Sequence, residues 1–247
     1  MPLDRSRGLL FVHIPKTAGT SIEERLGLRG PWQQEDQETC FGLIQSLPLL
    51  RHQFSSNFLQ HLTLAELTVL LGPELLGCTP FSVVRDPWTR LISSFRRKDP
   101  DLCQLYRYRC HAELEQLDLA AFIEVASWLD HPHLRPQRRF LLRAGADQLD
   151  PRLRIFQQER LADLEQWLNE RLGSALPLPH RNVNVPQTRL PELIRPNGRA
   201  CVSGSESCMR RITPASVTPD QPVFSPRNSR ISRSLRLWAS PRQTSRT

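Results

Sequence analysis

Two short apolar runs, each followed directly by a helical pattern, limit what this chain can fold into. The first run, residues 9–14, reads Leu-Leu-Phe-Val-His-Ile and ends at Pro15, and the second is Thr79–Val84. Short runs of strand-forming residues without regular polar alternation are typical of strands buried on both faces. Helical patterns follow the two runs at 21–28 and after Pro87. This alternation of strand and helix predicts an α/β fold with a parallel sheet.

Further elements are recognisable from helix caps and apolar spacing. Thr63 and Glu66 form a capping-box pattern, so we expect a helix over 64–71. Asp86 is placed to cap the helix that follows the second strand. The remaining predicted elements are one long helix over 111–129, a third short strand at 154–156 and a helix over 159–172.

The net charge of +8 comes from the C-terminal quarter of the chain. Residues 1–185 hold 22 basic and 22 acidic side chains, whereas residues 186–247 hold 11 arginines and 3 acids. The later segment is also rich in Pro and Ser and has no apolar period. We therefore predict a folded domain over 1–190 and a basic tail over 191–247 that is disordered or divergent. We expect only this tail to contact nucleic acid, and without specificity.

Other features exclude further classes of protein. No run of about 18 apolar residues is present, and the apolar stretch after the charged N-terminus is too short for a signal peptide. These features predict a cytoplasmic protein without a membrane span. None of the six cysteines forms a CxxC pair, which argues against a zinc ribbon, and we expect no metal cofactor. Although Cys103 and Cys110 could close a small disulfide loop, free thiols are expected without a secretory signal.

The segment between the first strand and its helix has the composition of a phosphate-binding loop. Lys16 supplies a positive charge, and Gly19 permits close approach of a ligand to the backbone. Thr17, Thr20 and Ser21 offer hydroxyl groups, while the helix N-terminus adds free N–H groups and a positive dipole end. The Walker A pattern GxxxxGK[ST] is absent, because here the lysine precedes the glycine. An ordinary turn with a helix cap is the alternative interpretation.

A second candidate site follows the second strand. Arg85 stands between the end of that strand and the next helix, and ligands of open α/β sheets bind at the carboxyl ends of strands. An arginine binds phosphate through two parallel hydrogen bonds. Ser93 lies two turns into the helix and is placed to share the same ligand. A surface pair of Arg85 with Asp86 is the alternative interpretation.

The two motifs together, PKTAGTS at 15–21 and RDPxxRxxSxF at 85–95, resemble those of sulfotransferases that use 3′-phosphoadenosine 5′-phosphosulfate (PAPS). The resemblance is to the carbohydrate branch, which includes heparan sulfate 2-O-sulfotransferases and bacterial relatives. It implies a P-loop-like three-layer fold, in which helices flank a central parallel sheet. The residues that it implies around the 5′-phosphosulfate are Lys16, Thr17, Ala18, Gly19, Thr20 and Ser21. Arg85 and Ser93 are implied to bind the 3′-phosphate.

Relatives in this branch also carry a histidine between the two motifs, which serves as base for the acceptor hydroxyl. His61 stands at that place, and His52 is the second candidate. A neutral imidazole can take a hydroxyl proton near pH 7, whereas a capping or surface histidine is the alternative interpretation. We interpret His13 as a packed core residue. We interpret His131, His133 and His180 as loop residues.

The resemblance implies transfer of a sulfuryl group from PAPS to a hydroxyl group of a carbohydrate, leaving 3′-phosphoadenosine 5′-phosphate (PAP). Lys16 would stabilise the leaving phosphate, and His61 would take the acceptor proton. Two other hypotheses stay open, a P-loop-type phosphotransferase and an inactive nucleotide-binding remnant with an anion-binding tail. The arginines that could meet an anionic acceptor, or simply form a solvated helical face, are Arg135, Arg138 and Arg139.

Overall fold

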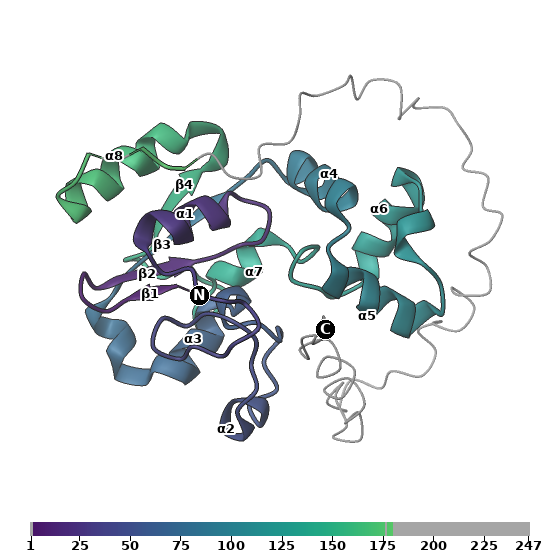
Figure 1. The fold of residues 1–247 in the computed structure, drawn as a ribbon, viewed down its shortest axis with the longest axis horizontal. Helices are drawn as coiled ribbons and strands as arrows, with labels where there is room; N and C mark the ends of the chain where they lie inside the picture. Colours follow the sequence, from purple (N-terminus) through teal and green to yellow (C-terminus); the bar gives the residue numbers. More distant parts are fainter. Residues whose placement is uncertain (1, 176, 180–247) are drawn as a thin grey trace, which may run out of the picture. The chain divides into compact units, whose positions relative to one another are not determined.

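A four-stranded sheet in the order β1-β2-β3-β4 lies at the centre of the described part of the protein (Figure 1). The structure is a computed structural model that describes residues 2–175 and 177–179 of the chain. The predicted boundary near residue 190 and the predicted tail lie outside these residues. The strands are β1 (Leu3–Asp4), β2 (Leu9–Val12), β3 (Thr79–Val84) and β4 (Arg154–Gln157).

The sheet is mostly parallel, as predicted. β2, β3 and β4 run parallel, with Phe11 opposite Phe81 and Ser82 opposite Ile155. The two-residue strand β1, which the sequence analysis missed, pairs antiparallel with β2. Val12 is opposite Ser82, so the loops that follow β2 and β3 leave the same edge of the sheet. This edge therefore brings together the two segments that were selected from the sequence.

The predicted helices are present with one main exception, and the helix at Pro100–Cys110 was not predicted. The α-helices are α1 (Gly19–Leu26), α2 (Leu47–Leu50), α3 (Leu64–Leu71), α4 (Pro87–Arg97), α5 (Pro100–Cys110), α6 (Leu119–Trp128), α7 (Gln137–Leu141) and α8 (Leu161–Leu172). The 3-10 helices are η1 (Leu59–His61), η2 (Gly72–Gly77), η3 (Leu114–Gln116) and η4 (Gln158–Arg160). The capping box of α3 and the Asp86 cap of α4 are both present, as predicted.

The exception is the single long helix expected over 111–129, which is wrong. Over this range the chain forms the short helix η3 and then α6, while α5 already ends at Cys110. His111 ends α5 in a left-handed conformation with φ 55°, which breaks the helical path. Asp118 starts α6 by accepting a hydrogen bond from the backbone N–H of Ala121 at 2.8 Å. The apolar residues on which the prediction rested, from Leu114 to Trp128, stand on both sides of the interruption between η3 and α6.

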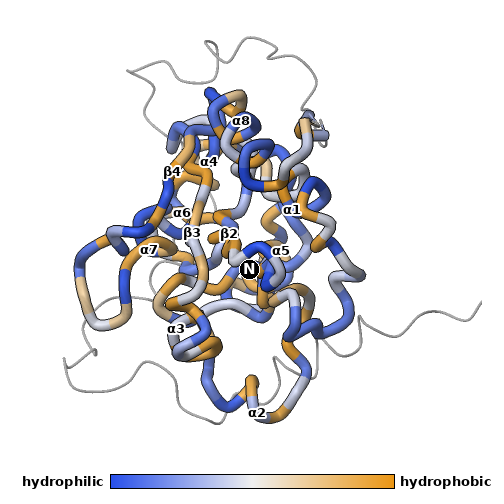
Figure 2. The backbone as a smooth tube through the Cα atoms, turned by 90° about the vertical axis from the view of Figure 1, so that its left-hand side faces the viewer, coloured by the Kyte–Doolittle hydropathy of each residue, from blue (hydrophilic) through white to orange (hydrophobic). Residues whose placement is uncertain are grey.

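Helices cover both faces of the sheet. Along β2, Leu9 and Phe11 pack in one apolar cluster with residues of α1 and α8, while Leu10 and Val12 pack in another with residues of α3 and α7. This alternation is the normal consequence of the two-residue period of a strand. Figure 1 shows α1 and α8 on one side of the sheet and α3 on the other, and Figure 2 shows hydrophobic residues along the central strands.

A third apolar cluster joins α4, α5 and α6 beside the sheet. Leu102 and Tyr106 of α5 pack there with Phe122 of α6, and Phe95 of α4 meets the Phe122 ring at 5.4 Å between centroids. The cluster fixes α4 and the start of α5 relative to each other. It thereby holds the residues that follow β3 close to those at the start of α5.

Two predictions on chain chemistry concern the described residues. No disulfide bond joins Cys40, Cys78, Cys103 or Cys110, in agreement with the prediction, whereas Cys201 and Cys208 lie outside the described part. Within that part, no helix has both the length and the apolar character needed to cross a membrane.

Candidate active site

The loop between β2 and α1 has an unusual backbone. Lys16 and Ala18 are left-handed, with φ of 72° and 69°. Each left-handed non-glycine residue costs on the order of 1 kcal/mol, so the surrounding contacts must enforce this path. Alternating handedness turns successive N–H groups toward one side, as in backbone nests that bind anions. No side chain caps α1 at Ala18, so the first N–H groups of that helix face the same region.

The hydroxyl groups of this loop differ in their availability. Thr17 is fully buried and donates its hydroxyl hydrogen to the carbonyl oxygen of Ile14 at 2.8 Å, which closes the turn. The hydroxyl hydrogen of Thr17 is therefore not available to a bound anion. Thr20 is half-buried at the start of α1, and Ser21 is buried one residue further on.

Gly19 is required by a neighbour within the protein. A Cβ atom at this position would lie 1.8 Å from Nε2 of His13. The His13 ring cannot easily move, because its Nδ1 is 2.7 Å from Oε1 of Glu23 and both side chains are buried. The ring also stacks on Phe11 at 5.4 Å. His13 is thus packed, as expected, and it fills the space that the glycine leaves open.

Arg85 joins the second motif to this loop. Its Nη1 donates to the carbonyl oxygen of Lys16 at 3.3 Å, and its Nε donates to Oγ1 of Thr89 at 3.2 Å. The backbone of Arg85 is held by the Gln137 side chain, which accepts from its N–H at 2.9 Å and donates to its carbonyl at 2.7 Å. Ser93 lies one helical turn beyond Thr89 on α4, so these side chains share one face with Arg85.

Arg90 connects three segments around the loop. Its guanidinium is buried and donates to the carbonyl oxygens of Pro15, Pro132 and Arg135 at 2.9, 3.0 and 3.0 Å. Burial lowers the pKa of Arg90 to about 10, so the group is still charged at neutral pH. One side chain of α4 therefore fixes both the loop after β2 and the segment before α7.

The Lys16 ammonium is bound within the protein. Its Nζ lies 3.1 Å from Oδ2 of Asp99, and the same oxygen lies 3.0 Å from Nδ1 of His133. Burial lowers the pKa of Lys16, although the Asp99 carboxylate partly offsets this effect. Burial also opposes the charge on Asp99, but His133 and Lys16 outweigh it and lower the pKa of Asp99 to about 2. The Asp99 carboxyl group is therefore charged at neutral pH.

His61 lies among other imidazole rings. Its ring centroid is 4.7 Å from that of His13 and 5.7 Å from that of His133. Its Nδ1 is buried and has no hydrogen-bond partner among the described residues. Burial, together with His13 and His133, lowers the pKa of His61 well below its usual range, so the ring is neutral at pH 7. A buried polar nitrogen without a partner is uncommon in structural positions.

The sequence analysis missed the acidic partners of this cluster. Asp101 Oδ2 lies 3.2 Å from Nε2 of His131, whose Nδ1 accepts a hydrogen bond from the His133 backbone N–H at 3.3 Å. Nε2 of His131 therefore carries the ring hydrogen. His131 and His133 do lie in a loop, as expected, but both are buried beside His61. The shared i, i+2 spacing of the two aspartates and the two histidines was the available signal.

Other candidate residues stand apart from this group. His52 is exposed and stacks on Phe54 at 5.2 Å, so the structure places His61, and not His52, beside the loop. Arg135 is buried and bonds Asp130 and Ser55, so its guanidinium is not exposed for contact with an acceptor. Arg138 and Arg139 are exposed on α7, and Arg138 pairs with Asp147. His180 lies outside the described residues.

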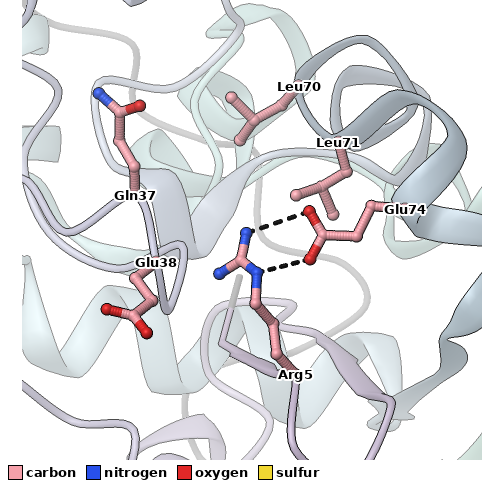
Figure 3. A pocket seen from close by; sticks show the side chains of 6 residues that line it. All are labelled: Arg5, Gln37, Glu38, Leu70, Leu71 and Glu74. Atoms are coloured by element: carbon pink, nitrogen blue, oxygen red, sulfur yellow. Dashed lines mark hydrogen bonds and ion pairs between the residues drawn. The ribbon is translucent and has the colours of Figure 1, made fainter.

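A surface hollow at the other end of the sheet is a separate feature (Figure 3). Arg5 stands before β2 and Glu74 before β3, so the hollow lies at the amino ends of these strands. The Arg5 guanidinium is paired with the Glu74 carboxylate, with 2.5 Å between Nε and Oε1, which neutralises its charge. The residues that line the hollow are Arg5, Gln37, Glu38, Leu70, Leu71 and Glu74.

Comparison with known proteins identifies one family. The family model described as "Sulfotransferase family" matches residues 3–141, which is more than half of the chain. The match runs from β1 to the end of α7 and includes the loop after β2, Arg85 and the histidine cluster. No curated protein and no solved structure gives a significant match.

Gly19→Ala tests the close approach of His13 to α1. The added methyl group collides with a buried ring, so we expect a loss of about 1–3 kcal/mol in the free energy of unfolding, measured by urea denaturation. Gly30→Ala is the matched control, because nothing lies within 4 Å of a Cβ at that position. The double variant Gly19→Ala/His13→Ala should lose less stability than the two single changes added together. Full additivity would contradict the proposed contact.

The neutral state of His61 predicts a pH dependence of stability. In the unfolded chain this ring takes up a proton as the pH falls through 6.5, whereas in the folded protein it stays neutral. The unfolded state then binds more protons, so stability falls from pH 7.5 to pH 5, by at most about 1.4 kcal/mol per pH unit for one such group. His131, whose pKa burial also lowers, contributes in the same direction.

Urea denaturation across this pH range would measure the effect. His61→Leu should show a smaller loss of stability than the wild-type protein between pH 7.5 and pH 5. His52→Leu, at an exposed position, serves as control and should keep the wild-type slope. An unchanged slope in His61→Leu would mean that His61 is not held neutral in the folded state.

Proposed function

The chain belongs to the sulfotransferase family, and from that premise we propose that it transfers a sulfuryl group from PAPS to a hydroxyl group of a saccharide. The observation that carries the proposal is the contact between the two motifs. Arg85 Nη1 bonds the carbonyl oxygen of Lys16, so the two proposed phosphate-binding groups meet at one edge of the sheet. That edge is the carboxyl end of parallel strands, where open α/β sheets bind ligands.

The groups present at this edge fit a donor with two anionic ends. Lys16, the left-handed backbone of the loop and the N-terminus of α1 offer one region of positive potential. A second anion-binding region is formed by Arg85, which follows the end of β3, and Ser93 on α4. We assign the 5′-phosphosulfate to residues 16–21 and the 3′-phosphate to Arg85 and Ser93.

In the proposed reaction PAPS supplies an activated sulfuryl group and leaves as PAP. The ammonium of Lys16 neutralises the charge that develops on the leaving phosphate, and the N–H groups at the start of α1 add to this stabilisation. The protein holds these groups in place before the reaction, because Arg90 and Arg85 fix the loop that carries them. Positioning and charge stabilisation are the main requirements of such group transfers.

His61 is the proposed base for the acceptor hydroxyl. Its neutral ring is able to take a proton at pH 7. Nδ1 is buried, so Nε2 is the ring nitrogen that we assign to the acceptor. The saccharide class of the acceptor rests on the likeness of the motifs at 15–21 and 85–95 to the carbohydrate branch of the family.

Calorimetry with PAP tests the donor site. We expect PAP to bind the wild-type protein more tightly than ATP, and Arg85→Gln to weaken PAP binding by about tenfold or more, since a bond between charged groups contributes about 1.5–3 kcal/mol. Arg154→Gln is the matched control, because Arg154 is exposed on β4 at the far end of the sheet. Preference for ATP, with Mg-dependent turnover, would support a phosphotransferase instead.

Lys16→Met tests the role of the ammonium in turnover. Loss of a donor that acts on developing charge should reduce kcat about 10²-fold or more in a sulfuryl-transfer assay with PAPS and a panel of saccharides. Lys98→Met is the matched control, because Lys98, which follows α4, bonds the carbonyl oxygens of Glu115 and Leu117. Near-normal turnover by Lys16→Met would refute the assigned role.

A further inference from the structure

Asp99 departs from the behaviour of equivalent residues in this protein. The helices α4, α5 and α6 each follow an aspartate, at Asp86, Asp99 and Asp118. Asp86 and Asp118 cap their helices by accepting a backbone hydrogen bond at 2.8 Å, whereas the Asp99 side chain makes no such bond. An N-cap bond contributes about 1 kcal/mol, so α5 forgoes that stabilisation. A residue that stands at a helix cap position but does not cap the helix often has a functional role instead.

The Asp99 carboxylate is used elsewhere. Oδ2 lies 3.1 Å from Nζ of Lys16 and 3.0 Å from Nδ1 of His133, and Oδ1 lies 3.4 Å from Nε of Arg97. The side chains of Lys16 and Asp99 are only 16% and 17% exposed, so solvent screens this pair less than a surface pair. The carboxylate therefore connects the proposed cofactor lysine to the imidazole beside His61.

The Lys16 ammonium cannot pair closely with two anions at the same time without weakening each contact. A donor phosphosulfate at the start of α1 would compete with Asp99 for Lys16. On the basis of the proposed function, we propose that Asp99 is a positioning residue, which holds Lys16 when no donor is bound and releases it to the donor's phosphosulfate. After the exchange, Nε of Arg97 at 3.4 Å and Nδ1 of His133 at 3.0 Å remain close to the Asp99 carboxylate.

Lysine titration tests the donor-free half of this proposal without any need for activity. The chain contains only two lysines, Lys16 and Lys98, so protein labelled with ¹³C-lysine gives two sets of side-chain signals. Asp99→Asn removes the charge that favours the ammonium and leaves Arg97 and Arg85 nearby, so Lys16 should titrate at lower pH than in the wild-type protein. Lys98, which bonds carbonyl oxygens, should not change.

Asp101→Asn is the matched control for this measurement. Asp101 lies two residues further on and pairs with His131, and Lys16 is not among its partners. This variant should leave the Lys16 titration as in the wild-type protein.

The asparagine of Asp99→Asn is itself able to cap α5, and Asp99→Ser provides a second variant with a capping side chain if the first one folds poorly. An unchanged Lys16 titration in a folded Asp99 variant would overturn the proposal.

A double-mutant cycle on PAP affinity tests the exchange itself. Asp99→Asn frees Lys16, so it should tighten PAP binding to the wild-type protein. Loss of a negative charge near an anion would also tighten binding when Lys16 is absent. The exchange therefore predicts that the tightening is at least about fivefold larger in the wild-type background than in the Lys16→Met background.

The outcomes separate this proposal from the proposed function. Equal tightening in both backgrounds, or weaker PAP binding by Asp99→Asn, would overturn the exchange while PAP remains the donor product. Failure of the folded wild-type protein to bind PAP would overturn the donor assignment and the exchange together. A lowered Lys16 titration combined with the larger tightening in the wild-type background would support the proposal.

Discussion

Arg90 lies on the buried face of α4 and directs its guanidinium to three backbone carbonyl oxygens. Pro15 belongs to the loop after β2, while Pro132 and Arg135 belong to the segment before α7. A guanidinium has several donors in one rigid plane, which a lysine ammonium does not, so one arginine is able to hold both segments. The backbone path of the loop and the place of the histidine cluster both depend on this contact.

Charge and burial are balanced around that framework. Lys16 and Arg85 lie at the edge where the strands end, and Asp99 partly neutralises the charge of Lys16. His61 forms no ion pair among the described residues and is neutral because it is buried, while Asp101 and Asp99 pair with His131 and His133. The site thus combines a region that attracts anions with an uncharged imidazole, and the proposed sulfuryl transfer to a hydroxyl group uses both.

Local signals in the sequence were sufficient for much of the fold. The capping box at Thr63 and the Asp86 cap gave correct helix starts, because each depends on residues three positions apart. The strands β2 and β3 were recognisable from their apolar runs, and the parallel sheet follows from the helices between them. The break between η3 and α6 was missed, because the apolar spacing continues across Leu117 and Asp118.

The candidate site was predictable only in part. The two motifs were found from their residue types, but the contacts of Asp99 with Lys16 and His133 join positions far apart in the chain. No local pattern specifies such contacts. Gly19 was predicted to let a ligand approach the backbone closely, but the group that fills the space beside it is His13 from the preceding strand. The role of Arg90 likewise depends on carbonyl groups of a distant segment.

A crystal structure of the protein with PAP would test the central claim most directly. The account predicts the 5′-phosphate within hydrogen-bonding distance of residues 16–21, and the 3′-phosphate on Arg85 and Ser93. PAP bound elsewhere, or absent from the crystal at saturating concentration, would contradict the assignment of this edge of the sheet as the donor site.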